Sequence, residues 1–121
     1  MANEEQLAIL KQGVDVWNRW REENLGVDIE LYGVYQIGKD LKGINFIGAD
    51  LREADFREAN LSKSFMIEAF MDEGYFKQAN LQESNLQEAS LVDAVFIEAN
   101  LSMTNFIKAK LNGAELDKAN L

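Results

Sequence analysis

The sequence predicts a mainly β fold: a solenoid that follows a short N-terminal α-helix. A large apolar residue recurs every five positions from Leu41 to Leu121, and a small residue usually stands two positions before it. The first 24 residues instead space their apolar side chains three and four positions apart. These observations divide the chain into residues 1–38 and residues 39–121.

Residues 4–24 are predicted to form one amphipathic helix, which Asn24 and Gly26 bring to an end. The first coil of a solenoid has an apolar end and unpaired backbone groups, so we expect the helix to cover it as a cap. The alternative is a ligand site around the two tryptophans. The predicted capping residues are Leu7, Leu10, Val14, Trp17 and Trp20.

Residues 27–38 are expected to form a degenerate, looser first coil. Ile29, Leu31 and Val34 already fall in the five-residue phase of the later repeat. Gln36 then occupies a position that the repeat reserves for a large apolar residue. The regular repeat is therefore expected to begin at Lys39.

Seventeen large residues fall on the five-residue step from Leu41 to Leu121: ten Leu, five Phe and two Met. Eleven of the seventeen residues two positions earlier are Ala. An α-helix cannot explain this spacing, because at about 100° per residue it would spread the large side chains around the whole cylinder. A continuous strand fails as well, because an odd step alternates between its two faces.

The spacing is satisfied if the chain turns once in every repeat. Ala49 and Leu51 then both point inward from a short extended piece, while Arg52 and Glu53 form an outward corner. A chain that turns regularly and rises by one strand spacing per circuit is a β-solenoid. The predicted core is Leu41, Phe46, Leu51, Phe56, Leu61, Met66, Met71, Phe76, Leu81, Leu86, Leu91, Phe96, Leu101, Phe106, Leu111 and Leu116.

The stretches ADLREADFREANL, ANLQESNLQEASL and AKLNGAELDKANL resemble the pentapeptide-repeat family, whose motif is A(D/N)LXX. The resemblance implies a right-handed, four-sided β-helix with four repeats in each coil. Residues 39–118 would then form four coils, and at about 4.8 Å per coil the tower would be roughly 20 Å tall. Small members with an N-terminal helix are abundant in cyanobacteria, and some are linked to developmental regulation.

The composition excludes several classes of function. The chain has 121 residues, of which 47% are hydrophobic, and a formal net charge of −9, which disfavours direct binding to nucleic acid or anionic membranes. It contains no Cys and no His, so the commonest nucleophiles, bases and metal ligands are missing. We expect no enzyme activity, cofactor or metal. Without a secretory signal or membrane span, the expected location is the cytoplasm.

Two polar columns receive structural interpretations. Residues twenty apart are expected to stack, which aligns Glu53, Glu73 and Asp93 on one side. These carboxylates could bind a hard cation, but a solvated face is the simpler interpretation. The column of Asp40, Asn60, Asn80, Asn100 and Asn120 is expected to support the turns beside it.

A candidate protein-interaction patch comes from departures from the motif. Phe65, Phe70 and Tyr75 replace Asn or Asp at outward positions in three successive repeats. Ile47, Ile67 and Ile107 share a corner position that Gln87 interrupts. Aligned exposed apolar residues mark interaction surfaces, unless the N-terminal segment folds over them.

Two functions remain open at this stage. The first is a non-enzymatic interaction or scaffold module with an unidentified protein partner. The second is a DNA mimic that binds an enzyme such as DNA gyrase, as some family members do. Residues 39–121 carry only 14 acidic against 9 basic residues, and a tower of roughly 20 Å imitates only about six base pairs. The uncapped C-terminal end could be blunted locally or could join a second copy.

Overall fold

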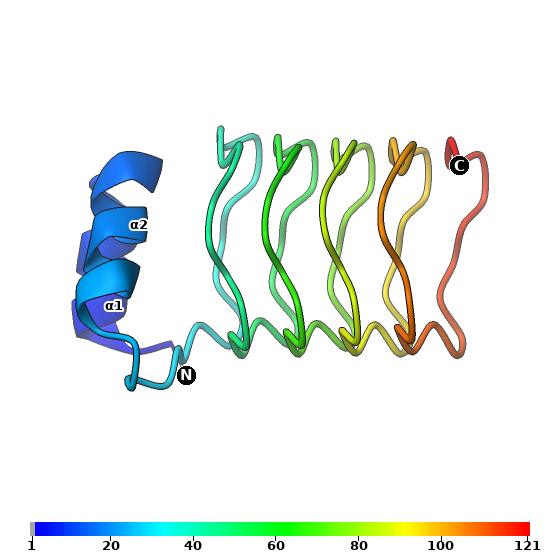
Figure 1. The fold of residues 1–121 in the computed structure, drawn as a ribbon. Helices are drawn as coiled ribbons and strands as arrows, with labels where there is room; N and C mark the ends of the chain where they lie inside the picture. Colours follow the sequence, from blue (N-terminus) through cyan, green and yellow to red (C-terminus); the bar gives the residue numbers. More distant parts are fainter. Residues whose placement is uncertain (1) are drawn as a thin grey trace.

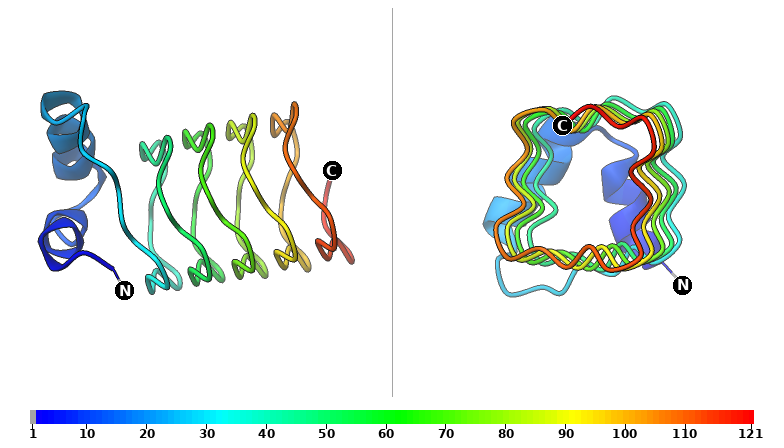
Figure 2. Two further views of the ribbon diagram at one scale, coloured as in Figure 1. Left: turned by 90° about the horizontal axis from the view of Figure 1, so that it is seen from below. Right: turned by 90° about the vertical axis from the view of Figure 1, so that its right-hand side faces the viewer.

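The computed structural model describes residues 2–121, which form two helices against one end of a four-sided coil (Figures 1 and 2). Helices α1 (Glu4–Leu10) and α2 (Val14–Glu23) lie at the N-terminal end. The rest of the chain winds away from them, and its outline viewed along the axis is nearly square (Figure 2). Neither helix of the described chain has the length and hydropathy needed to cross a membrane.

The prediction of a single helix over residues 4–24 is wrong, because the chain breaks between Leu10 and Val14. Gly13 adopts a φ of 104°, a conformation that glycine tolerates and other residues rarely adopt, and it precedes the first turn of α2. Helix α1 has a side-chain cap, in which Asn3 Oδ1 accepts a hydrogen bond from the Gln6 N–H at 3.0 Å. The apolar spacing continues across the break, which is why periodicity alone does not reveal it.

The coil is held by parallel pairing between residues twenty positions apart. Bridge residues recur every five positions from Glu30 to Asn120, and Asp50 pairs with Glu30 below and Phe70 above. Its N–H donates to the Ile29 carbonyl at 2.9 Å, and its carbonyl accepts from the Leu31 N–H at 2.9 Å. Four repeats therefore make one coil.

The predicted β character consists entirely of these isolated bridges, and residues 2–121 contain no strand longer than a single bridge residue. The ladder also starts earlier than expected. Glu30 and Tyr35 pair with Asp50 and Asp55 in the common register, so residues 30–38 form a regular part of the first coil, not a loose one. Gln36 is half-buried at the position of a large apolar residue.

Each corner is a tight turn of four residues, and the third of them has a positive φ, as Glu53 does in the turn from Leu51 to Ala54. The turn after Leu51, for example, is closed by a hydrogen bond of 3.0 Å from the Ala54 N–H to the Leu51 carbonyl. Five of these corner residues are glycines, whereas thirteen others have side chains and φ between 56° and 61°. A non-glycine residue there costs about 1 kcal/mol, which the paired coils must offset.

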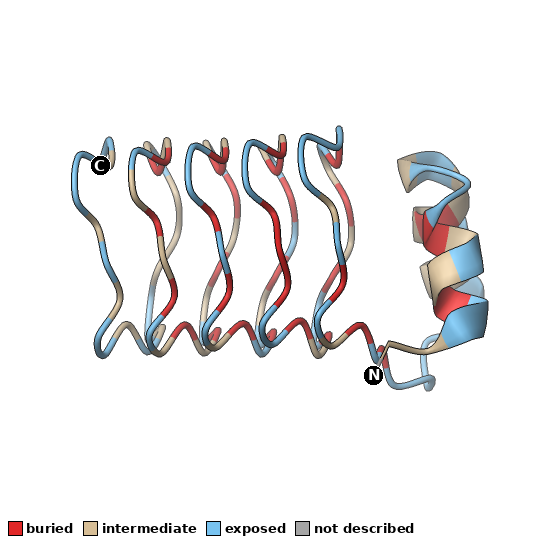
Figure 3. Ribbon diagram, turned by 180° about the vertical axis from the view of Figure 1, so that it is seen from behind, coloured by how far each residue is buried: buried red, intermediate tan, exposed pale blue. Residues whose placement is uncertain are grey.

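Buried positions recur from coil to coil along the tube (Figure 3), and the large inward residues from Leu41 to Leu101 are among them. Phe56, Phe76 and Phe96 form one column, with ring centroids 5.4 Å and 4.9 Å apart. The predicted core residues from Leu41 to Leu101 are buried. Phe106, Leu111 and Leu116 are only partly buried. They belong to the last coil of the described chain, and no further coil packs on it there.

The two helices close the N-terminal end of this core. Trp17 is fully buried, stacks edge-on against Phe46 with centroids 5.8 Å apart, and donates its indole N–H to the Asn45 carbonyl at 2.8 Å. Of the other residues expected in the cap, Leu10 is buried, whereas Leu7, Val14 and Trp20 are partly buried against the core. The Trp17 side chain therefore fills the end of the tube.

Candidate functional site

Five of the six predicted patch residues are exposed and Ile67 is partly buried, but the structure does not bring the six together. Phe65, Phe70 and Tyr75 are 48%, 52% and 47% exposed. They are bridge residues five positions apart, so they lie on three successive sides of the coil. Ile107 is exposed but lies two coils beyond Ile67, with Gln87 between them.

Four of the six residues remain as neighbours around one corner: Ile47, Phe65, Ile67 and Phe70. We call this group the apolar corner. The Gly48 N–H donates to the Ile67 carbonyl at 2.9 Å, which places the turn that holds Ile47 directly below the turn that holds Ile67. Phe65 and Phe70 flank Ile67 on the two sides that meet there. The helices do not cover this corner, although Arg21 in α2 donates to the Ile47 carbonyl at 2.8 Å.

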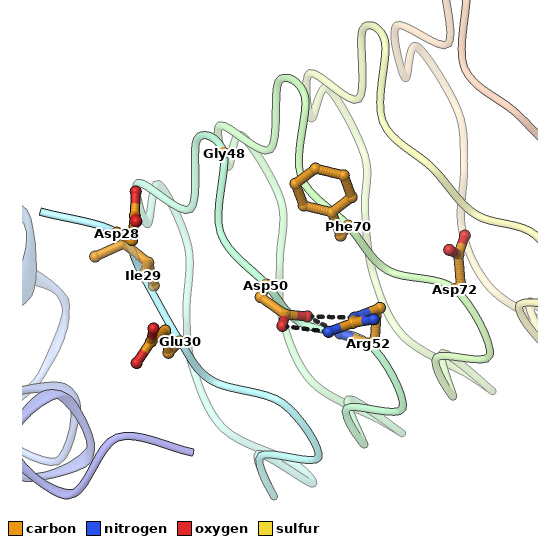
Figure 4. Close-up of a pocket in the computed structure, with 8 residues that line it drawn as sticks. All are labelled: Asp28, Ile29, Glu30, Gly48, Asp50, Arg52, Phe70 and Asp72. Carbon is orange, nitrogen blue, oxygen red and sulfur yellow. Dashed lines mark hydrogen bonds and ion pairs between the residues drawn. The ribbon is translucent and has the colours of Figure 1, made fainter. Parts of the chain in front are cut away.

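A groove of about 510 Å³ begins beside this corner and runs toward the N-terminal end (Figure 4). Gly48 has no side chain and leaves space beside Phe70, whose ring forms one wall. The lining residues are Asp28, Ile29, Glu30, Gly48, Asp50, Arg52, Phe70 and Asp72. The groove is therefore mostly acidic, with one exposed aromatic ring.

Arg52 is the only cation that the described chain contributes to the groove, and Asp50 already binds it. The guanidinium donates to both Asp50 oxygens, at 2.9 Å from Nε and 2.8 Å from Nη2. These hydrogen bonds lower the pKa of Asp50 below its ordinary value. Asp72 accepts hydrogen bonds from the Ser90 hydroxyl and the Val92 N–H. Asp28 and Glu30 add two further exposed carboxylates at the N-terminal end of the groove.

The same aspartate–arginine pair occurs on the next side, between Asp55 and Arg57. Arg57 Nη2 lies 2.7 Å from Asp55 Oδ2, and the hydrogen bonds from this guanidinium lower the pKa of Asp55. The repetition indicates that such pairs stabilise the outward surface of the repeat. The Asp50–Arg52 pair alone is therefore no sign of a binding site.

The carboxylate column does not form a metal centre in the described part of the chain, where no group of three acidic residues is close enough to hold an ion. Glu53 instead accepts a hydrogen bond from the Tyr32 hydroxyl, which raises the pKa of Tyr32. Asp93 lies against Gly113, and its carboxylate oxygen occupies the space that a Cβ at this position would need. Glu53 and Asp93 thus contact the protein's own surface groups.

The asparagine column supports the turns. The Asn60 side-chain oxygen accepts a hydrogen bond from the Ser62 N–H at 3.1 Å, and Asn80 does the same for Gln82 at 3.0 Å. The Asn60 amide also donates to Asp40 one coil below, at 3.3 Å. These contacts link the bridge position both to its own corner and to the neighbouring coil.

The groove was not predicted from the sequence. Its residues come from three consecutive coils, so their proximity follows only once the twenty-residue register is known. Gly48 was the one local signal, because it stands between Asp28 and Glu68 in a corner column that otherwise holds side chains. The apolar corner was predicted only in part, because Phe65, Phe70 and Tyr75, from three consecutive repeats, lie on three sides of the coil and do not form one surface.

Comparisons with known proteins agree with this architecture. The family model described as pentapeptide repeats matches residues 40–73, 75–113 and 85–121, with 8 copies. A solved pentapeptide repeat protein, Rfr23 from the cyanobacterium Cyanothece 51142, is 30% identical with a TM-score of 0.57, and the match covers 71% of this chain and 56% of that one. No curated protein matched the sequence.

A second solved structure is similar in fold alone. It is QnrB1, a plasmid-mediated fluoroquinolone resistance protein, at 16% identity and a TM-score of 0.63, with 74% of this chain and 48% of that chain covered. The present chain thus spans about half the length of both solved proteins.

Proposed function

Since this chain belongs to the pentapeptide-repeat family, we propose that it is a non-enzymatic protein-interaction module, which presents the sides of a rigid, right-handed coil to another protein. The apolar corner of Ile47, Phe65, Ile67 and Phe70 is the observation that carries this proposal. Contiguous apolar side chains on an outer surface are typical of binding surfaces, because their exposure to water is unfavourable.

The fold itself does not require aromatic residues at these positions. At the bridge position below Phe65, Asn45 uses its side-chain oxygen to accept a hydrogen bond from the Ile47 N–H at 3.0 Å. A phenylalanine cannot make this bond to the corresponding backbone group of its own turn. Phe65 and Phe70 thus replace a residue type that supports the turn, and a role in binding accounts for the replacement.

A module of this kind also needs a surface that changes little on binding. Every coil is hydrogen-bonded to the next through pairs such as Asn60–Asn80, and the columns of large side chains fill the interior. Because such a surface is already ordered before a partner binds, this chain loses little conformational entropy on binding. The apolar corner is therefore preorganised for binding.

A DNA mimic remains the alternative, with weaker support. The likeness to QnrB1 concerns the fold alone. A duplex is charged along both strands, whereas the side with Asn60, Asn80 and Asn100 carries neutral amides at its bridge positions. Inhibition of DNA gyrase supercoiling by the purified chain would favour this alternative, and a lack of effect at high concentration would exclude it.

The proposal is tested by affinity capture from a lysate of the source organism, with quantification by mass spectrometry. The double variant Phe65→Asn/Phe70→Asn should lose the partner that the wild-type protein captures, because it removes both aromatic rings of the apolar corner and introduces the residue type found at Asn45. The control is Tyr75→Asn, which removes a similarly exposed aromatic residue from another side. Equal capture by all three proteins would contradict the proposal, provided that their circular dichroism spectra agree.

A further inference from the structure

We propose that the apolar corner and the adjacent groove together form a docking surface, which binds a protein segment in which an Arg or Lys stands beside a large apolar residue. This inference rests on the proposed function and specifies the chemistry of the partner. The apolar corner would contact the apolar side chain, and the groove of Figure 4 would receive the cation. Phe70 belongs to both, so the two contacts are continuous.

The charge around the groove identifies a cation as its occupant. The side of the coil that contains the groove, counted with its two flanking corners, carries far more acidic than basic residues. Its acidic residues are Asp28, Glu30, Asp50, Glu53, Glu68, Asp72, Glu73, Glu88 and Asp93, and its basic residues are Arg52, Lys108 and Lys110. The two lysines lie two coils beyond the coil of Phe70, and Arg52 is paired with Asp50. A basic segment meets unneutralised carboxylates there, whereas nucleic acid or an anionic membrane would be repelled.

The geometry of Phe70 adds specificity for a cation that has an apolar neighbour. The Phe70 ring is about half exposed beside the space that Gly48 leaves open. It lines the same groove as the carboxylates of Asp28 and Glu30. A guanidinium or ammonium group over the ring gains a cation–π contact together with the attraction of the carboxylates. An apolar residue next to it in the segment can then pack against Ile67 around the corner.

The test is a titration of the ¹⁵N-labelled full chain with synthetic peptides, followed by heteronuclear NMR. The probe is the peptide RLRSRLR, and the matched peptides are RSRSRSR, which lacks apolar residues, and ELESELE, which reverses the charge. We expect RLRSRLR to shift the amide signals of Gly48, Asp50, Phe70 and Asp72 first. RSRSRSR should bind more weakly, and ELESELE should cause no shift.

Substitutions separate the two contacts. Phe70→Asn and Glu30→Gln should each weaken the binding of RLRSRLR, the former by roughly tenfold, as is typical of a central aromatic contact. Tyr75→Asn and Glu115→Gln make the same chemical changes on the neighbouring side and should leave the affinity unchanged. Both Asn variants introduce a residue type found at other bridge positions, so they are expected to fold, and their NMR spectra will show whether they do.

Several outcomes would overturn the inference. These are equal affinity for RLRSRLR in wild type and Phe70→Asn, shifts spread evenly over acidic residues of all sides, or no binding at about 1 mM peptide, which corresponds to less than about 4 kcal/mol. Different outcomes would contradict the proposed function. If lysate capture depends on Phe65 and Phe70 but no basic peptide binds, the chain is an interaction module and the partner chemistry is wrong. If the peptide requires Phe70 while capture is unchanged, the groove is assigned correctly and the corner is not the site of the captured partner.

Discussion

Gly74 shows how a single residue adjusts the core. It occupies an inward position that is Ala in most repeats. A Cβ added there would lie 2.7 Å from Cε2 of Phe76 and 3.1 Å from the Met71 carbonyl oxygen. The missing methyl group therefore gives the Phe76 ring the space in which it stacks on Phe96, 4.9 Å between centroids. The glycine is required by packing, since its φ is not in the left-handed region.

We therefore expect Gly74→Ala to destabilise the protein by about 1–3 kcal/mol, because the added methyl group must displace an aromatic ring in a filled core. Urea unfolding followed by circular dichroism measures the change. Ser64→Ala is the control: its buried hydroxyl has no hydrogen-bond partner in the structure, so removing it should leave stability unchanged or slightly increased. An unchanged midpoint for Gly74→Ala would show that Phe76 moves without cost.

At the scale of elements, the two helices close the solenoid by imitating a missing coil. In α2, the Asn18 side chain accepts a hydrogen bond from the Asn45 N–H at 2.8 Å and donates one to the Gly43 carbonyl at 3.0 Å. In α1, Gln6 makes the same two bonds to the Glu30 N–H and the Asp28 carbonyl, at 2.7 Å and 2.8 Å. One side-chain amide from each helix thus satisfies backbone groups that a lower coil would otherwise pair.

Asn18→Asp tests this role, because a carboxylate keeps the acceptor for Asn45 but places an oxygen opposite the Gly43 carbonyl. The lost donor should destabilise the cap by about 1–3 kcal/mol. Hydrogen exchange at the Asn45 amide, measured by NMR, should become faster, while exchange at the Asn85 amide in the middle of the tower should follow global stability. Gln12→Glu makes the same chemical change at an exposed residue in the turn after α1 and serves as the control. Unchanged exchange at Asn45 would show that Asn18 does not hold this end.

The repeat was predictable from the sequence because its cause is local. Five residues determine which side chains point inward, and Ala49, Leu51 and Phe56 obey this rule regardless of the rest of the chain. The break between the helices was not predictable from apolar spacing, although Gly13 provided a signal. The roles of Gln6 and Asn18 depend on which backbone groups lie opposite them.

The candidate site was predictable only in part for a similar reason. Exposure of Phe65, Phe70 and Tyr75 follows from the five-residue phase, and all three are exposed. Their separation onto different sides follows from the twenty-residue coil, which is a property of the whole turn. The acidic groove requires both periods at once, since Asp28, Asp50 and Asp72 come from successive coils and different positions of the repeat.

At the scale of the whole molecule, charge is distributed unevenly around the tower. One corner column contains Glu53, Glu73 and Asp93, which follow one another at twenty-residue steps. Another corner column contains Glu58, Gln78, Glu98 and Lys118, and there Glu98 has a basic neighbour in the next coil. At about 4.8 Å between coils, like charges in the first column repel one another, and the acidic side is maintained at a cost in stability.

Charge reversal in these two columns measures that cost. Glu73→Lys places a cation between Glu53 and Asp93, so it should stabilise the protein by about 0.5 kcal/mol at low salt. Glu98→Lys places a second cation beside Lys118 and should be neutral or destabilising, although φ is nearly the same at both positions, 58° and 60°. Since the Debye length falls to about 8 Å at physiological ionic strength, the difference between the two variants should shrink as salt is added. Equal urea midpoints for both variants at low salt would show that the carboxylates of the acidic column do not repel one another measurably, and that the acidic side costs the fold nothing.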